Sequence, residues 1–181
     1  MINNKGFTII EVLVSAVMIS VLIMAAFTTL DVGRNSWFSG DVRAELRKEI
    51  IRAFMAMERE LRETRPAQLQ SFPHGTSSSE VTFKIPQDSN DADTTILDPL
   101  GYVEWSGNIR YWLNTDNEII RTDSLGSTRV LARSITNLEF SRNRNPVLPQ
   151  DLLIINITAQ KKSSIGNAVS ETGQLIVKMR N

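Results

Sequence analysis

A single carboxylate lies inside the most apolar stretch of this sequence. From Phe7 to Leu30 nearly every side chain is apolar, and Glu11 is the only charged residue among those 24 positions. A charge deep in a membrane helix costs on the order of 3 kcal/mol, so such residues usually face a partner. Glu11 therefore either sits at headgroup level or pairs with a positive group at its own depth. A cut after Gly6 would create such a group, the α-amine of Phe7 in a neighbouring copy.

Few other residues have types and spacing suited to chemistry. His74 is the only histidine and cysteine is absent, so a histidine-based metal site or catalytic triad has no further members. The run from Asp88 to Asp93 has Ala92 at its fifth position and no glycine after it, which favours a solvated loop over a calcium site. Asn156 opens a glycosylation-like triplet inside a predicted strand, where acceptors are not expected. We expect no cofactor, no metal and no enzymatic activity.

Composition narrows the class of protein. The chain has 181 residues, which suits one modest domain with an appendage. Twenty acidic and twenty basic residues balance, so nothing predicts a nucleic-acid partner. Because there is no cysteine, no disulfide framework exists.

The apolar stretch is long enough to cross a membrane. As a helix, its 24 residues span roughly 36 Å, against about 30 Å for the hydrocarbon core of a bilayer. A cleavable signal peptide, a plain anchor and a buried core helix are the alternatives. The length and the absence of a clean cleavage site after the stretch speak against the first. Lys5 precedes the stretch and predicts that the leader is cytoplasmic, with the remainder outside the inner membrane.

The N-terminal residues resemble a known motif. The run Lys5-Gly6-Phe7-Thr8-Ile9-Ile10-Glu11-Val12-Leu13-Val14 is similar to the N-terminal motif of type IV pilins and type II secretion pseudopilins. The resemblance implies that a prepilin peptidase cuts between Gly6 and Phe7 and methylates the new Phe7 N-terminus. It also implies that Glu11 pairs with the N-terminus of an adjacent subunit during assembly.

A second helical pattern follows the apolar stretch. Gly33 and Gly40 bracket a segment where a helix could kink or weaken. Beyond them an apolar stripe at three- and four-residue spacings predicts an amphipathic helix that Pro66 ends. The stripe consists of Val42, Leu46, Ile50, Phe54, Met57 and Leu61. Residues 7–65 would extend on the order of 90 Å as one unbroken helix.

The remainder of the chain predicts short strands between turns. The candidate strands are Val81–Ile85, Tyr102–Ser106, Ile109–Leu113, Glu118–Arg121, Arg129–Arg133, Ser134–Ser141, Leu152–Ala159 and Leu175–Met179. Short connections favour antiparallel neighbours. We therefore expect an α+β fold, in which a long N-terminal helix packs on an antiparallel β-sheet. The expected organisation is a leader at 1–6, a transmembrane and assembly helix at 7–30, a helical stem at 31–66 and a periplasmic β domain at 67–181.

A weaker resemblance concerns the strand region. Residues 109–121 and 130–140 are similar to the sheet of J-type minor pseudopilins and W-type minor pilins, and the missing cysteines speak against a major pilin. The resemblance implies a minor subunit that initiates or tips a filament at the inner membrane. Its implied partners are the prepilin peptidase, other subunits, an assembly platform and membrane lipid. A membrane-tethered periplasmic binding module that does not polymerise is the alternative. Pilus, secretion and DNA-uptake filaments stay equally open.

Overall fold

A computed structural model describes residues 8–70, 72–73, 75–87, 96–97, 100, 102–144, 151–164 and 166–180. The chain divides into two compact units, Met1–Asp41 and Val42–Asn181. The first unit contains the start of the single α-helix of the described residues. The second contains the rest of that helix and all the described strands.

Helix α1 (Ile9–Glu63) includes both of the helical segments that the sequence predicts. Its helical hydrogen bonding continues through Gly33 and Gly40, where we expected a weak point. A Cβ added at either glycine would meet no described atom within 4 Å, so no close contact requires glycine there. The helix ends just before Pro66, which opens a short 3-10 turn, η1 (Pro66–Gln68). Proline suits that first position because its fixed φ fits a helical turn and its missing N–H leaves no donor unpaired.

The C-terminal part of α1 buries the stripe that the sequence predicts. The buried residues of the helix are Val42, Leu46, Ile50, Ala53, Met57 and Leu61. Phe54, which we placed in the stripe, is only partly buried and packs at the edge of the core. Ala53 lies inside instead, because a small side chain lets the helix approach the strands closely.

The strands that the structure describes form two antiparallel sheets of four strands each. One sheet has the order β1 (Ser77–Ser78), β6 (Ile135–Arg144), β7 (Asp151–Lys162) and β8 (Ala168–Lys178). The other has the order β2 (Glu80–Phe83), β3 (Ile109–Leu113), β4 (Ile119–Thr122) and β5 (Thr128–Ala132). The α+β architecture with a long N-terminal helix and antiparallel strands is thus confirmed, with the strands divided between two sheets.

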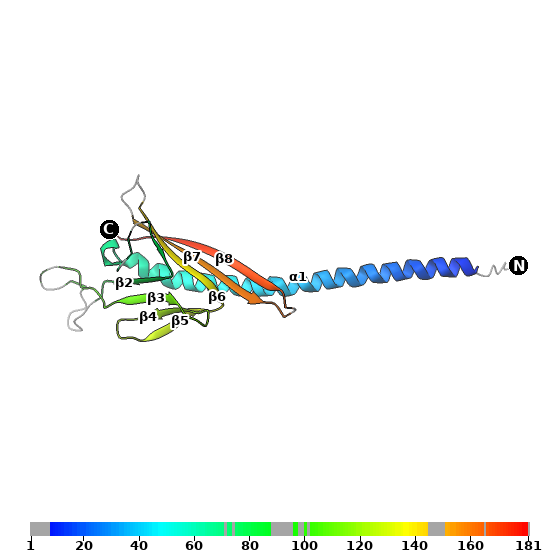
Figure 1. Cartoon of the computed structure of the whole chain (residues 1–181), viewed down its shortest axis with the longest axis horizontal. Helices are drawn as coiled ribbons and strands as arrows, with labels where there is room; N and C mark the ends of the chain where they lie inside the picture. Colours follow the sequence, from blue (N-terminus) through cyan, green and yellow to red (C-terminus); the bar gives the residue numbers. More distant parts are fainter. Residues whose placement is uncertain are drawn as a thin grey trace. The chain divides into compact units, whose positions relative to one another are not determined.

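Alternating apolar side chains of both sheets join the helix stripe in one core. On β7, Leu153, Ile155 and Ile157 are fully buried, and on β2 and β3 so are Phe83 and Tyr111. Alternation at a period of two puts these side chains on one face of each strand. Within Val42–Asn181, Figure 1 shows the strands gathered along the C-terminal part of α1.

Strand β8 and the helix run side by side in the same direction. Glu171 near the start of the strand accepts from Arg47 at 2.8 Å. Further along, the Cα of Gly173 lies under Ile50 and Phe54, so closely that an added Cβ would be 2.8 Å from Ile50 Cγ2. After the strand ends, Arg180 N donates to Thr64 O, just beyond the helix, at 3.2 Å. Glycine at 173 therefore permits the close packing of the helix on the strand.

A partly buried cluster joins the helix to the second sheet. Arg121 Nε lies 3.0 Å from Glu60 Oε1, and these side chains are 22% and 14% exposed. Tyr111 Oη donates to Glu60 Oε2 at 2.6 Å. Burial, and then the hydrogen bond to the Glu60 carboxylate, raise the pKa of Tyr111 far above its usual value of 10. The phenol therefore stays protonated in the folded protein across the ordinary pH range.

Two strand predictions differ from the structure. Tyr102–Ser106 forms only isolated bridges, Leu97 to Val103 and Pro86 to Trp105. Proline has no N–H to give to a ladder, so pairing at Pro86 cannot extend into a strand. Strand β8 begins seven positions before the predicted Leu175, at Ala168. Its polar residues and Gly173 have weak strand propensity, and the eleven-residue pairing with β7 overrides it.

Gly173→Ala should destabilise the fold by about 1–3 kcal/mol, because the added methyl group overlaps Ile50 and Phe54. Urea unfolding of the full chain in nanodiscs, followed by circular dichroism, measures the change. Gly40→Ala is the matched control. No described atom lies within 4 Å of its added Cβ, so it should lose no stability. Equal stability of the Gly173→Ala variant and the parent would contradict the close contact.

Tyr111 should make the fold sensitive to alkaline pH. A group whose pKa is raised on folding contributes stability below its unfolded pKa, and that contribution is lost as pH rises above it. Above about pH 10 the parent should lose about 1.4 kcal/mol of unfolding free energy per pH unit through Tyr111. Tyr111→Phe should remove this loss, and Tyr102→Phe, at a site 70% exposed, should keep it. Parallel pH profiles for the parent and Tyr111→Phe would refute the role.

Candidate functional site

Glu11 lies in the first turn of α1, where it caps the helix together with Thr8. Thr8 directly precedes the helix, and its Oγ1 accepts from Glu11 N at 3.3 Å. In return Glu11 Oε2 accepts from Thr8 N and from Thr8 Oγ1, each at 3.4 Å. This reciprocal arrangement is a capping box, which satisfies backbone N–H groups that the first helical turn leaves unpaired.

The capping box leaves much of the Glu11 carboxylate unused. In the part of the chain that the structure describes, Thr8 provides all the hydrogen bonds to Glu11 Oε2. Both are 3.4 Å long, beyond the usual range of about 2.7–3.2 Å for the nitrogen donor and of about 2.5–3.0 Å for the hydroxyl donor. A carboxylate has about four lone-pair positions to fill. Glu11 can therefore accept a stronger, charged donor from outside the chain.

The other polar side chains of the apolar stretch are satisfied within the helix. Ser15 Oγ donates to Glu11 O, and Ser20 Oγ donates to Ala16 O, each at 2.8 Å. Thr28 and Thr29 make the same kind of bond to the preceding turn, at 2.9 Å to Ala25 O. Hydroxyls bonded in this way leave no hydrogen-bond donor unpaired in an apolar environment. Among these polar side chains, Glu11 thus has the weakest hydrogen bonds.

Apolar side chains cover every face of the stretch that contains Glu11. The described helix has an 18-residue window near the N-terminus with mean hydropathy 2.6, none of it buried, so α1 is long and apolar enough to cross a membrane. Its side chains are widely exposed, including Ile9 at 83% and Met24 at 71%. An exposed apolar surface of this extent marks a membrane or protein interaction site.

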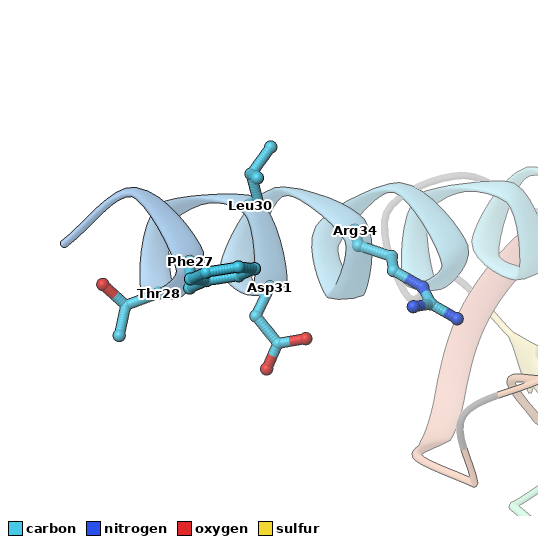
Figure 2. Close-up of a pocket in the computed structure, with 5 residues that line it drawn as sticks. All are labelled: Phe27, Thr28, Leu30, Asp31 and Arg34. Carbon is cyan, nitrogen blue, oxygen red and sulfur yellow. The ribbon is translucent and has the colours of Figure 1, made fainter. Parts of the chain in front are cut away.

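The apolar stretch ends abruptly at Asp31. Figure 2 shows the side chains of Phe27 and Leu30, with that of Asp31 beside them and that of Arg34 further along the helix. The Arg34 guanidinium lies over the Phe38 ring, 5.7 Å from its centroid. Next to it, Trp37 is 77% exposed. Aromatic and basic residues of this kind gather where a membrane helix leaves the hydrocarbon for the headgroups.

Only some of the predicted site residues lie in the part of the chain that the structure describes. Gly6 and Phe7, at the predicted cut, lie outside the described residues, as do His74 and the loop Asp88–Asp93. Those predictions stay predictions. Asn156 lies within β7 as expected, and its side chain bonds to Glu139 and Gln174 on the neighbouring strands. The described residues contain no group of three or more histidines and carboxylates that could hold a metal ion.

Sequence reasoning missed two features of this site. The spacing of Thr8 and Glu11 fits the S/T-x-x-E pattern of a capping box, which would have predicted the helix start. The aromatic pair Trp37-Phe38 and Arg34 fit the belt expected just past a membrane helix. Both signals are present in the sequence as residue types at fixed spacings.

One comparison with known proteins bears on this geometry. Residues 1–27 match the family described as the prokaryotic N-terminal methylation motif. No curated protein and no solved structure matches the chain. The matched segment includes Gly6, Phe7 and Glu11 and ends inside the apolar stretch. It supports a relation to the type IV pilins and pseudopilins, and with the α+β fold it points to a structural subunit rather than an enzyme. Residues 1–27 thus form a prokaryotic N-terminal methylation motif, in agreement with the resemblance seen in the sequence.

Proposed function

We propose that this chain is a minor pilin or pseudopilin that helps initiate or tip a filament. A prepilin peptidase cuts the precursor between Gly6 and Phe7 and methylates Phe7. The mature subunit then leaves the bilayer by packing its apolar helix against those of its neighbours. The methylation motif supports the processing step, and the exposed apolar side chains of α1 supply the surface for packing.

Glu11 is the observation on which the proposal depends. The hydroxyls of Ser15, Ser20, Thr28 and Thr29 are satisfied inside the helix. Among the described residues, the Glu11 carboxylate has only long bonds to Thr8. Moving such a carboxylate into an apolar bundle is unfavourable unless a cation meets it there. The α-amine of a neighbouring Phe7 is a cation at a fixed place in the sequence. The pair would therefore set the axial register between subunits.

The β-rich unit supports the minor role and the location outside the membrane. Its described residues form an apolar core, which can stabilise the unit without a disulfide. The chain has no cysteine, which speaks against a major pilin. We place this unit in the periplasm, on the far side of the inner membrane from Lys5. Its partners would be other pilin-like subunits and the inner-membrane assembly platform, and the apolar helix would contact lipid before assembly.

A tethered binding module that does not polymerise is the alternative. Such a protein needs an apolar anchor but neither a cut after Gly6 nor a carboxylate four positions beyond it. The two functions therefore differ in the chemistry of the N-terminus.

Mass spectrometry of the protein purified from membranes should find an N-terminus at Phe7 that carries an added methyl group. The same chain expressed without a prepilin peptidase should keep residues 1–6. An N-terminus at Met1 in the presence of the peptidase, or a cut after Ala26, would refute the filament subunit.

Glu11→Val should block incorporation into filaments while the chain stays in the membrane. Leaving the amine of a neighbouring Phe7 unpaired in an apolar bundle costs about 3 kcal/mol, which is roughly a 100-fold loss of incorporation. Immunoblots of sheared filaments and of membrane fractions measure both quantities. Thr8→Val is the matched control, because it removes the capping hydroxyl and keeps the carboxylate. It should still assemble, and equal defects in the two variants would assign Glu11 to capping alone.

A further inference from the structure

A small apolar cavity opens at the C-terminal end of α1. Its volume is about 200 Å³, and little of its lining is polar. Its apolar lining comes from two isolated bridges, Pro86 with Trp105 and Leu97 with Val103, and from Ile96 beside them. Ile96 and Leu97 are each almost half exposed, at 45% and 46%. The cavity is thus open to the surface and can be entered from solvent.

The volume of the cavity limits what it can hold. Sites for drug-sized ligands measure about 300–1,000 Å³, which is larger than this one. An apolar cavity of about 150 Å³ is sufficient for a benzene ring. The cavity therefore fits one apolar or aromatic side chain of a larger partner, rather than a free cofactor.

Basic side chains surround the entrance. Arg65 and Arg180 line the cavity together with Glu63. The Arg65 guanidinium also lies over the Trp105 ring, 5.7 Å from its centroid. In the described part of the chain, no ion pair engages Arg65, Arg180 or Glu63. Two arginines thus face one carboxylate at the mouth of an apolar cavity.

A shallow groove carries the positive charge further along the helix. It shares Glu63 and Arg180 with the cavity and continues over Met55 and Arg59. Glu58, also in the groove, is already paired with Arg62 at 2.9 Å. Arg59, like Arg65 and Arg180, forms no ion pair with any described residue. Over the cavity and groove, three arginines without ion pairs therefore outnumber the single such carboxylate, Glu63.

The C-terminal end of the helix is itself a reason for arginines to lie nearby. The last carbonyls of an α-helix carry partial negative charge, which favours cations nearby. That effect explains arginines beside the helix end but not an open apolar cavity between them. An apolar cavity with basic residues around its entrance is typical of a surface that binds an acidic segment of another protein.

We propose that the cavity and groove at the end of α1 bind an acidic segment of a partner protein. One aromatic or large aliphatic side chain of that segment fills the cavity between Trp105 and Leu97. Neighbouring carboxylates of the segment pair with Arg65, Arg180 and Arg59. The site lies wholly within Val42–Asn181, so the inference goes beyond the filament function and does not depend on it.

Fluorescence anisotropy with labelled peptides tests this binding on the full chain in nanodiscs. The probe is a peptide of alternating Asp and Ser with one central Phe. The first comparison peptide has Ser in place of Phe, and the second has Lys in place of each Asp. We expect saturable binding of the probe, at least tenfold weaker binding of the Ser peptide, and no binding of the Lys peptide. Absence of probe binding, or equal binding of the probe and the Ser peptide, would overturn the proposal.

Charge-reversal variants locate the site. Arg65→Glu and Arg180→Glu should each weaken probe binding at least tenfold, because each replaces an attraction to the probe with a repulsion. Arg129→Glu is the matched control. It changes the same net charge on β5, outside the cavity and groove, and should alter affinity less than twofold. An equal loss in all three variants would show a general charge effect and would refute this site. Circular dichroism of each variant confirms that it is folded.

Discussion

The first half of α1 is apolar on every side, and its described apolar side chains are exposed. A polypeptide with such a helix must place it in lipid or among other apolar helices. This requirement explains why serine and threonine in the stretch turn their hydroxyls back onto their own backbone. Glu11 is the one carboxylate of the stretch and cannot bond back to its own helix in this way. Its stability in an apolar environment therefore depends on a partner outside the helix.

The second half of the same helix obeys a different constraint. From Val42 onward one apolar face is buried and most residues of the other faces are polar or charged, so the helix packs mainly on one side. Both sheets supply that partner. Glu45, Glu49 and Glu60 reach Lys161, Arg133 and Arg121 on or beside the strands. Glu60 and Arg121 are the least exposed of these, so solvent screens the attraction between their charges least.

Much of this was predictable from local pattern. The apolar stripe, the helix end near Pro66 and most strands follow from spacing and turn residues. The turn at Asn114–Asn117 is another example, since Asn117 adopts φ 60°, which asparagine tolerates. The division into two sheets and the full length of β8 were not predictable, because they depend on pairing partners distant in sequence. The bonding of Glu60 to Tyr111 and Arg121 likewise joins residues more than fifty positions apart. The cavity near Trp105 also needs the folded chain.

The parallel course of β8 and the helix has a mechanical consequence. A pull along α1 reaches β8 through Glu171, Gly173 and the bond from Arg180 to Thr64. Strand β8 then bears the load along its own axis, and its eleven paired residues must slide past β7 together rather than peel apart singly. Shear of this kind engages many hydrogen bonds at once. A chain without cysteine can in this way resist tension without a covalent cross-link.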